Sequence, residues 1–159
     1  MAEKSPVLNF VHLCENAFLS QDGKLNMIGV FRTLRAQKFP FRQPKITVVT
    51  NITISSKTKL KIQILKKEAR EVIAKFDVSL QLPDGTKTPR ETGFISDFNN
   101  TKFETPGPYL VEIWVDEEIQ KTVPFEFVQV SPPPKKKGLP CLCPSSTKKF
   151  PRGCEMQQF

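Results

Sequence analysis

The sequence predicts an all-β fold, an antiparallel immunoglobulin-like β-sandwich of about seven to nine strands. Apolar residues recur with a period of two along most of the chain, and turn-forming residues interrupt them about every ten residues. No long segment has the i, i+3, i+4, i+7 apolar spacing of an amphipathic helix, although residues 65–76 contain helix formers and allow a single helical turn. With 159 residues and 38% apolar content, the chain is large enough for one hydrophobic core.

The middle of the chain shows the alternation most clearly. Residues 45–55, KITVVTNITIS, and residues 59–67, KLKIQILKK, flank a short polar turn, so we expect them to form a hairpin. Residues 71–82, EVIAKFDVSLQL, form the next expected strand, which stops at Pro83-Asp84-Gly85. The apolar faces of these strands comprise Ile46, Val48, Ile52, Ile54, Leu60, Ile62, Ile64, Val72, Ala74, Phe76, Val78, Leu80 and Leu82.

The two ends of this region are expected to be strands as well. Residues 108–130 predict a terminal hairpin with a turn at residues 116–118, in which Pro124 lies at an edge or points its missing N–H outward. Residues 7–19 and 24–36 flank Gln21-Asp22-Gly23, which favours a tight turn between strands. Residues 93–104 predict two short strands, or a strand and a loop, whose phenylalanines plug one end of the core.

Composition divides the chain into a β-sandwich domain, residues 1–130, and a disordered tail, residues 131–159. The tail opens with Ser131 and three prolines, which favour an extended spacer. It holds six basic residues and one acidic residue, a net charge of +5, so most of the chain's excess of +8 lies outside the domain. The basic residues are Lys135, Lys136, Lys137, Lys148, Lys149 and Arg152.

Three tail cysteines, Cys141, Cys143 and Cys154, raise the question of a metal site. Structural zinc needs four ligands, commonly in two halves with two-residue spacing, whereas the tail offers one C-x-C pair and a single further cysteine. Cys14, His12 or a partner chain would have to complete the site. The spacing favours unpaired thiols, so we expect no metal and no cofactor.

Other residues with chemical potential are weak candidates for catalysis. His12 and Cys14 alternate on one predicted strand face, but nothing in the sequence identifies an orienting carboxylate or an oxyanion hole. No phosphate-binding glycine-rich loop and no H-E-x-x-H motif is present. The acidic run at residues 116–118 lacks the alternating pattern of a calcium loop, which favours solvated turn acids. We therefore expect a protein that is not an enzyme.

The single tryptophan suggests a binding surface. Alternation places it on the strand face opposite Tyr109 and Ile113. If that face is outer, it forms an apolar patch with an acidic rim, suited to a protein partner; the alternative is that neighbouring strands cover the tryptophan. The candidate partner-binding residues are Leu110, Glu112, Trp114 and Asp116. A further basic surface, an ordinary solvated edge in its simplest interpretation, comprises Arg32, Arg35, Lys38 and Arg42.

These observations leave two functional hypotheses. The first is a non-catalytic protein-interaction or assembly module that binds another protein or its own copy. The alternative is binding of an anionic polymer, nucleic acid or a membrane surface, through the basic tail. The N-terminal residues lack an uninterrupted apolar signal region, and no run is long enough to cross a membrane, so we expect a cytoplasmic location without an integral membrane segment.

Three segments together resemble a known kind of family. These are LCENAFLSQDGKLNMIGVF near the start, the FP that follows, and GPYLVEIWVD late in the domain. They are similar to a family of small uncharacterised bacterial proteins, a domain of unknown function, over roughly residues 7–130. The resemblance implies a bacterial cytoplasmic β-sandwich and supplies no assigned activity or site residues.

Overall fold

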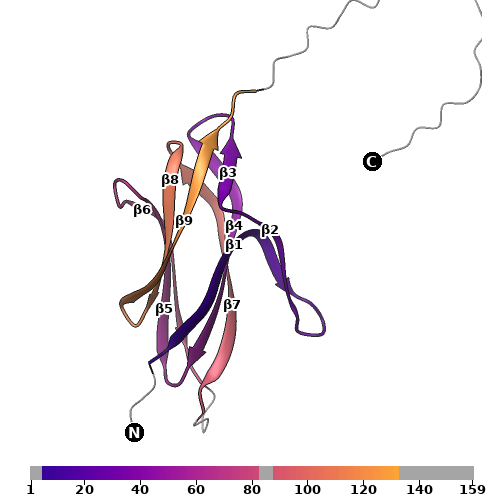
Figure 1. Ribbon diagram of the computed structural model, residues 1–159, viewed down its shortest axis with the longest axis vertical. Coiled ribbons are helices and arrows are strands. Elements are labelled where there is room, and N and C mark those ends of the chain that lie inside the picture. Colours follow the sequence, from indigo (N-terminus) through magenta and orange to yellow (C-terminus); the bar gives the residue numbers. More distant parts are fainter. Residues whose placement is uncertain (1–4, 83–87, 133–159) are drawn as a thin grey trace, which may run out of the picture.

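The computed structural model describes residues 5–82 and 88–132, and these form a β-sandwich, as predicted (Figure 1). The described residues contain nine strands and no helix. The strands are β1 (Val7–Leu19), β2 (Leu25–Val30), β3 (Thr33–Ala36), β4 (Phe41–Ile54), β5 (Thr58–Lys66), β6 (Val72–Leu80), β7 (Arg90–Phe103), β8 (Gly107–Val115) and β9 (Glu118–Gln129).

The strands form two sheets whose order is that of an immunoglobulin-like domain. One sheet has the order β2-β1-β4-β7 and the other the order β3-β9-β8-β5-β6. Every neighbouring pair is antiparallel except β3 and β9, which run parallel. Thus β1-β4-β7 correspond to immunoglobulin strands A, B and E, and β9-β8-β5-β6 to G, F, C and C′. The hydroxyl of Tyr109, near the start of β8, donates to the carbonyl oxygen of Thr105 at 2.5 Å, a tyrosine-corner arrangement.

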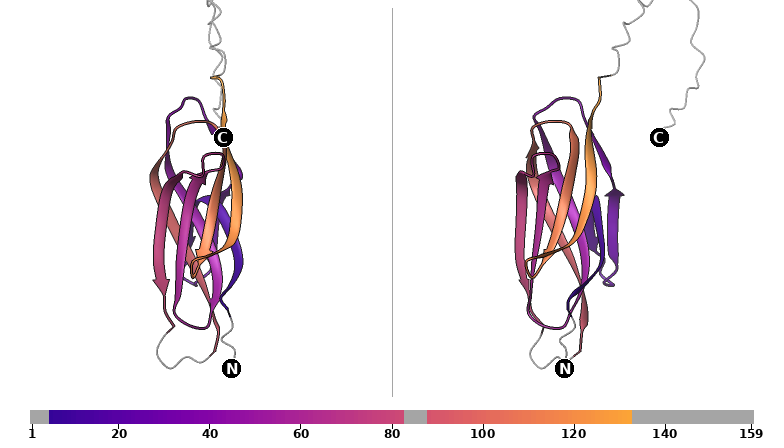
Figure 2. Two further views of the ribbon diagram at one scale, coloured as in Figure 1. Left: turned by 90° about the vertical axis from the view of Figure 1, so that its left-hand side faces the viewer. Right: turned by 60° about the vertical axis from the view of Figure 1, so that its left-hand side comes forward.

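The core lies between the inner faces of the two sheets. The left view of Figure 2 shows the sheet of β9, β8, β5 and β6 from its outer face, with the other sheet behind it. Alternation directs one set of apolar residues of β4, β5 and β8 inward, among them Val48, Ile62 and Val111, and these are almost completely buried. An aromatic cluster closes one end of the core. Phe103 of β7 places its ring 4.9 Å from Tyr109, 6.2 Å from Phe125 and 4.4 Å from Phe127, all three from the facing sheet.

Phe103 faces inward because β7 changes the face it presents to the core. Phe94 and Phe98 pack inward at even positions, whereas Thr101 and Phe103 are buried at odd positions. Between them lies Asn100, whose φ of 52° is in the left-handed region that asparagine tolerates better than most residues. The prediction of two short strands, or a strand and a loop, over residues 93–104 was therefore wrong. One continuous strand runs to Phe103 and turns its side chains over at Asn100.

The expected hairpin of residues 45–55 and 59–67 was also wrong. β4 pairs with β1 and β7, whereas β5 pairs with β6 and β8 in the other sheet. The short connection between them passes from one sheet to the other, so the two strands do not form a hairpin. Both strands carry an apolar face, and facing each other across the sandwich buries those faces more fully than lying side by side.

The segment expected as one strand at residues 24–36 is divided between the two sheets. β2 pairs with β1, and β3 pairs with β9. Between them, the N–H of Phe31 donates to the carbonyl oxygen of Leu13 at 3.1 Å, and the carbonyl oxygen of Arg32 accepts from the N–H of Glu126 at 2.9 Å. Residues 31–32 therefore tie the two sheets together.

The turns predicted at residues 21–23 and 116–118 are both confirmed. The β1–β2 turn contains Gly23 with φ of 78°, and the β8–β9 turn is a two-residue turn in which Asp116 and Glu117 have φ of 48° and 72°. Positive φ at both central residues matches the twist of a hairpin. A carboxylate oxygen of Asp116 also accepts from the N–H of Lys59 at 2.8 Å, which fixes this turn against β5.

Pro124 occupies the position that the sequence predicts. Successive residues of a strand direct their N–H and C=O groups to opposite sides. Because Glu126 donates away from β8 to Arg32, the donor that Pro124 lacks would also point away from β8. β3 pairs with β9 only at residues 126–129, so this part of β9 is an edge.

Replacement of Phe103 by alanine tests the aromatic cluster. The ring is fully buried, so Phe103→Ala should lower the free energy of unfolding by about 3–5 kcal/mol. Phe18→Ala is the matched control because the Phe18 ring is 46% exposed, and it should change stability by less than about 0.5 kcal/mol. Urea denaturation of both variants measures the difference. Equal losses would contradict the assignment of Phe103 to the core.

Two buried threonines of β4 provide a second test. Thr50 faces the core, and its hydroxyl has no hydrogen-bond partner among the described residues, whereas the Thr47 hydroxyl donates to an Asp97 carboxylate oxygen at 2.7 Å. Thr50→Val should therefore raise the free energy of unfolding by about 1 kcal/mol, and Thr47→Val should lower it by a similar amount. Thermal unfolding compares the two. A loss of stability in Thr50→Val would show that its hydroxyl is satisfied.

Candidate interaction surfaces

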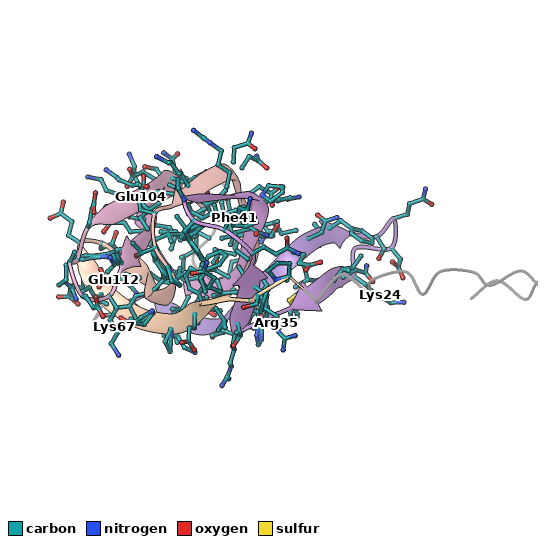
Figure 3. The ribbon with its side chains drawn as sticks, turned by 90° about the horizontal axis from the view of Figure 1, so that it is seen from above. Lys24, Arg35, Phe41, Lys67, Glu104 and Glu112 are labelled. Atoms are coloured by element: carbon teal, nitrogen blue, oxygen red, sulfur yellow. The ribbon has the colours of Figure 1, made fainter. Side chains whose placement is uncertain are left out.

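The β1–β2 hairpin projects from the sandwich and exposes apolar side chains. Figure 3 shows it extending away from the body of the domain, with Lys24 at its far end. Among the eight exposed large apolar residues of the described chain, five lie on this hairpin: Phe18, Leu19, Met27, Ile28 and Val30. Within the described residues, β2 pairs only with β1, so its other edge is open. We call these five side chains the hairpin patch.

The hairpin is well formed locally. At its turn, the Lys24 ammonium lies 2.6 Å from a carboxylate oxygen of Asp22, and the Ser20 hydroxyl donates to the same carboxylate. The hydrogen bond from Lys24, followed by that from Ser20, lowers the pKa of Asp22. Gly29 is required within β2, since its φ is 64° and a Cβ there would lie 2.8 Å from a carboxylate oxygen of Glu15. The exposed patch therefore belongs to an ordered hairpin.

The face around Trp114 points away from the core, but neighbouring side chains already bind its polar and aromatic groups. Leu110 is buried, and Glu112 is 2% exposed. The Glu112 carboxylate accepts from the Arg70 guanidinium at 2.6 Å and from the Trp114 indole N–H at 3.2 Å. The Lys61 ammonium lies 4.0 Å from the centre of the Trp114 ring. Partner binding by Leu110, Glu112, Trp114 and Asp116 stays a prediction.

The outer face of the β1-β4-β7 sheet holds a polar cluster around Cys14. Lys45 lies 3.0 Å from Asp97 and donates to the side chain of Asn16 at 2.8 Å, above the buried Thr47. The Cys14 thiol is 0% exposed and donates to the carbonyl oxygen of Thr47 at 3.7 Å. Burial first, and the negative charge of Asp97 second, raise its pKa. A nucleophilic cysteine needs a lowered pKa, so this environment opposes the Cys14 and His12 hypothesis.

A groove runs along the side of the sandwich where β1 and β9 lie across from each other, the side shown on the right in the left view of Figure 2. Its volume is about 490 Å³. Its apolar walls come from β1, β9 and residues 30–31, and three residues with cationic or ionisable side chains line it: His12, Arg32 and Lys121. Among the described residues, neither an aspartate nor a glutamate lines it. We call this the β1–β9 groove.

A second hollow of about 400 Å³ lies between β5, β6 and the β8–β9 turn. Its charges are balanced, because Lys59 and Lys61 face Asp77 and Glu117. It therefore selects neither an anion nor a cation.

The remaining sequence predictions concern the basic tail, metal binding and membrane spans. The tail lysines, Arg152 and the three tail cysteines lie outside the described residues, so anion binding by the tail stays a prediction. Within residues 5–82 and 88–132, no group of three histidine, cysteine or acidic side chains could hold a metal ion. The same part of the chain contains no helix long and apolar enough to span a membrane.

The hairpin patch and the β1–β9 groove were not identified from the sequence. The signal for the patch was available: in residues 24–30, apolar residues fall on both faces of the strand, which a half-buried strand does not require. The groove depends on where residues 31–32 cross between sheets, and no local pattern shows that His12, Arg32 and Lys121 then line one surface.

One family model matches the chain, that of a family of unknown function (DUF6941), over residues 9–128. This agrees with the uncharacterised family that the sequence resembles over residues 7–130; its bacterial origin stays a prediction. No curated protein matches the chain in sequence.

Solved structures similar to this chain share little sequence with it. An immunoglobulin-like protein of Pseudomonas aeruginosa is 12% identical, with a TM-score of 0.45 over 80% of this chain and 100% of that one. The alkylpurine DNA glycosylase AlkC of Pseudomonas fluorescens is 12% identical, with a TM-score of 0.42 over 74% of this chain and 30% of that one. A β-glucosidase of Listeria innocua is 15% identical, with a TM-score of 0.41 over 63% and 15%. The chain thus spans less than a third of either enzyme.

The raised pKa of Cys14 gives a testable dependence on pH. The folded protein holds this proton more tightly than the unfolded chain, where a thiol has a pKa of about 8.5. The resulting stabilisation is complete below that value and is lost as pH rises through the folded pKa. The stability advantage of the native protein over Cys14→Ala should therefore shrink between pH 7 and pH 10 in urea denaturation. The three tail cysteines are present in both the native protein and the variant, so they do not contribute to the difference between the two. A difference in the free energy of unfolding that stays constant with pH would contradict the prediction.

Proposed function

Since the chain belongs to DUF6941, a family of unknown function, its surfaces are the basis for a functional assignment, and we propose that the domain is a non-catalytic protein-interaction module. The observation that carries this proposal is the hairpin patch. Its side chains are about half exposed or more at Phe18, Leu19, Ile28 and Val30. Phe18, Ile28 and Val30 share one face of the hairpin, and Leu19 and Met27 the other. Apolar side chains exposed together on one hairpin are a feature of protein-binding sites, because leaving them in water is unfavourable.

The open edge of β2 supports the same proposal. Proteins usually protect an edge strand with charges, prolines or bulges, because its unpaired N–H and C=O groups invite another strand. Residues 25–30, LNMIGV, contain neither a charge nor a proline. A partner that covers the patch can therefore also pair with β2, combining apolar burial with backbone hydrogen bonds.

The absence of catalysis and the cytoplasmic location are parts of this proposal. The buried, protonated thiol of Cys14 is consistent with a structural cysteine. A free cysteine also fits a compartment in which thiols stay reduced. The face around Trp114 is retained as a second contact surface, for which the partly exposed indole ring is the candidate anchor.

Crosslinking in cells tests the proposal directly. A photoreactive residue in place of Ile28, which shares a face of the hairpin with Phe18, should crosslink a specific protein, whereas the same residue at Val72, an apolar side chain of β6 that is 47% exposed, should not. The crosslinked protein is then purified and its binding to the full chain measured. Phe18→Lys and Ile28→Lys should each weaken that binding by at least about tenfold, because each buries a charge in an apolar contact.

Val72→Lys is the matched control and should leave the affinity unchanged. Circular dichroism and thermal unfolding establish that the hairpin variants remain folded. Equal crosslinking at both positions, or unchanged affinity in both hairpin variants, would refute the hairpin patch as the interface. Loss of binding in Trp114→Ala alone would move the interface to the Trp114 face.

A further inference from the structure

The β1–β9 groove begins where the chain changes sheets. Residues 31–32 bond to Leu13 of β1 and to Glu126 of β9 and bridge the two strands. Beyond this bridge, β1 has no described neighbour on its outer side at residues 7–12, and β9 has none at residues 118–124. Two strand edges, one from each sheet, therefore flank the groove.

Both edges direct backbone groups outward. Leu13 accepts from Phe31 on the outer side of β1, so Val11, two residues earlier, directs its N–H and C=O the same way. On β9, Glu126 donates outward to Arg32, so Thr122 directs both its groups outward, while Pro124 offers only its carbonyl oxygen. Val11 and Thr122 both line the groove. An extended peptide is the kind of ligand that such groups bind.

The charges of the groove indicate what kind of peptide. Arg32 and Lys121 form no ion pair with any residue of the described chain, and His12 adds a third group that can carry positive charge. The chain's own tail is a poor occupant, since residues 131–159 carry a net charge of +5. Proteins that bind single-stranded nucleic acid commonly stack its bases on exposed aromatic rings, whereas Phe31 is partly buried and packs edge-on against Phe125 with 6.3 Å between ring centres.

We propose that the β1–β9 groove binds an extended acidic segment of a partner protein, which pairs with a strand edge and places its carboxylates on Arg32 and Lys121. This inference rests on the proposed function and specifies the partner's chemistry. Val30 belongs both to the groove and to the hairpin patch, so one partner can occupy both surfaces continuously. The apolar walls then accept the alternate side chains of the segment.

Synthetic peptides provide the test. The probe is a fluorescein-labelled peptide of alternating valine and glutamate, and its binding to the purified full chain is followed by fluorescence anisotropy. A peptide with lysine in place of glutamate tests charge, one with interspersed prolines tests backbone pairing, and a single-stranded oligonucleotide tests a nucleic-acid ligand. The glutamate peptide should bind at least about tenfold more tightly than the lysine and proline peptides.

Charge-reversal variants locate the site. Arg32→Glu and Lys121→Glu should each lower the affinity for the glutamate peptide by about tenfold, and the double variant should bind the lysine peptide more tightly than the glutamate peptide. Lys67→Glu makes the same change of charge outside the groove, at a residue labelled in Figure 3, and should alter affinity less than about twofold. Because Arg32 and Lys121 are exposed, these variants should fold normally.

Each other outcome overturns the inference. Equal binding of glutamate and lysine peptides, or no effect of either groove variant, removes the groove as an acidic-peptide site. Tighter binding of the oligonucleotide that both groove variants weaken assigns the surface to nucleic acid, and self-association lost in Lys121→Glu assigns it to a second copy of the chain. The Phe18→Lys variant separates the two proposals. This variant should bind the glutamate peptide with unchanged affinity. A negative result for the groove therefore does not refute the hairpin patch, which the crosslinking experiment tests separately.

Discussion

The insertion of Phe103 from one sheet into an aromatic cluster of the other is the contact on which the end of the sandwich depends. The rings of Tyr109, Phe125 and Phe127 all come from β8 and β9, and Phe103 is the member of the cluster that joins them to β7. Edge-to-face and tilted ring packing of this kind adds to the burial of apolar area. The cluster also anchors β9, whose free upstream edge forms one wall of the β1–β9 groove.

The crossing at residues 31–32 connects this core to the candidate surfaces. The chain pairs with β1 as β2, crosses at residues 31–32 and then pairs with β9 as β3. Residues 7–12 of β1 and residues 118–124 of β9 therefore have no described partner on their outer edges. The β1–β2 hairpin, on the other side of the crossing, extends past the body of the sandwich, and its apolar residues consequently have no facing sheet within the described chain to cover them (Figure 1). One change of sheet thus produces both the projecting hairpin and the open groove.

Local pattern predicts the strands, but it does not predict which sheet each strand joins. Alternation correctly assigned Val48 and Ile62 to buried faces, yet whether β4 and β5 pair or face each other depends on the length and path of their connection. Phe103 was likewise assigned to the core correctly, while the reversal of face within β7 has no signal in a period of two. Alternation placed Trp114 on the face of β8 opposite Tyr109, but the Arg70 guanidinium that neutralises Glu112 comes from a turn distant in sequence.

The contrast between compensated and uncompensated surfaces is the main support for the proposed binding sites. Around Trp114, a buried carboxylate has a cation and an indole donor, and the tryptophan ring has an ammonium above it. Around Cys14, Lys45 bridges Asp97 and Asn16. Within the described chain, the hairpin patch and the groove have no comparable compensation: one exposes apolar carbon beside an open strand edge, and the other gathers positive charge without an acid. A partner with apolar and acidic side chains along one extended segment would satisfy both, and Val30 joins the two surfaces along its path.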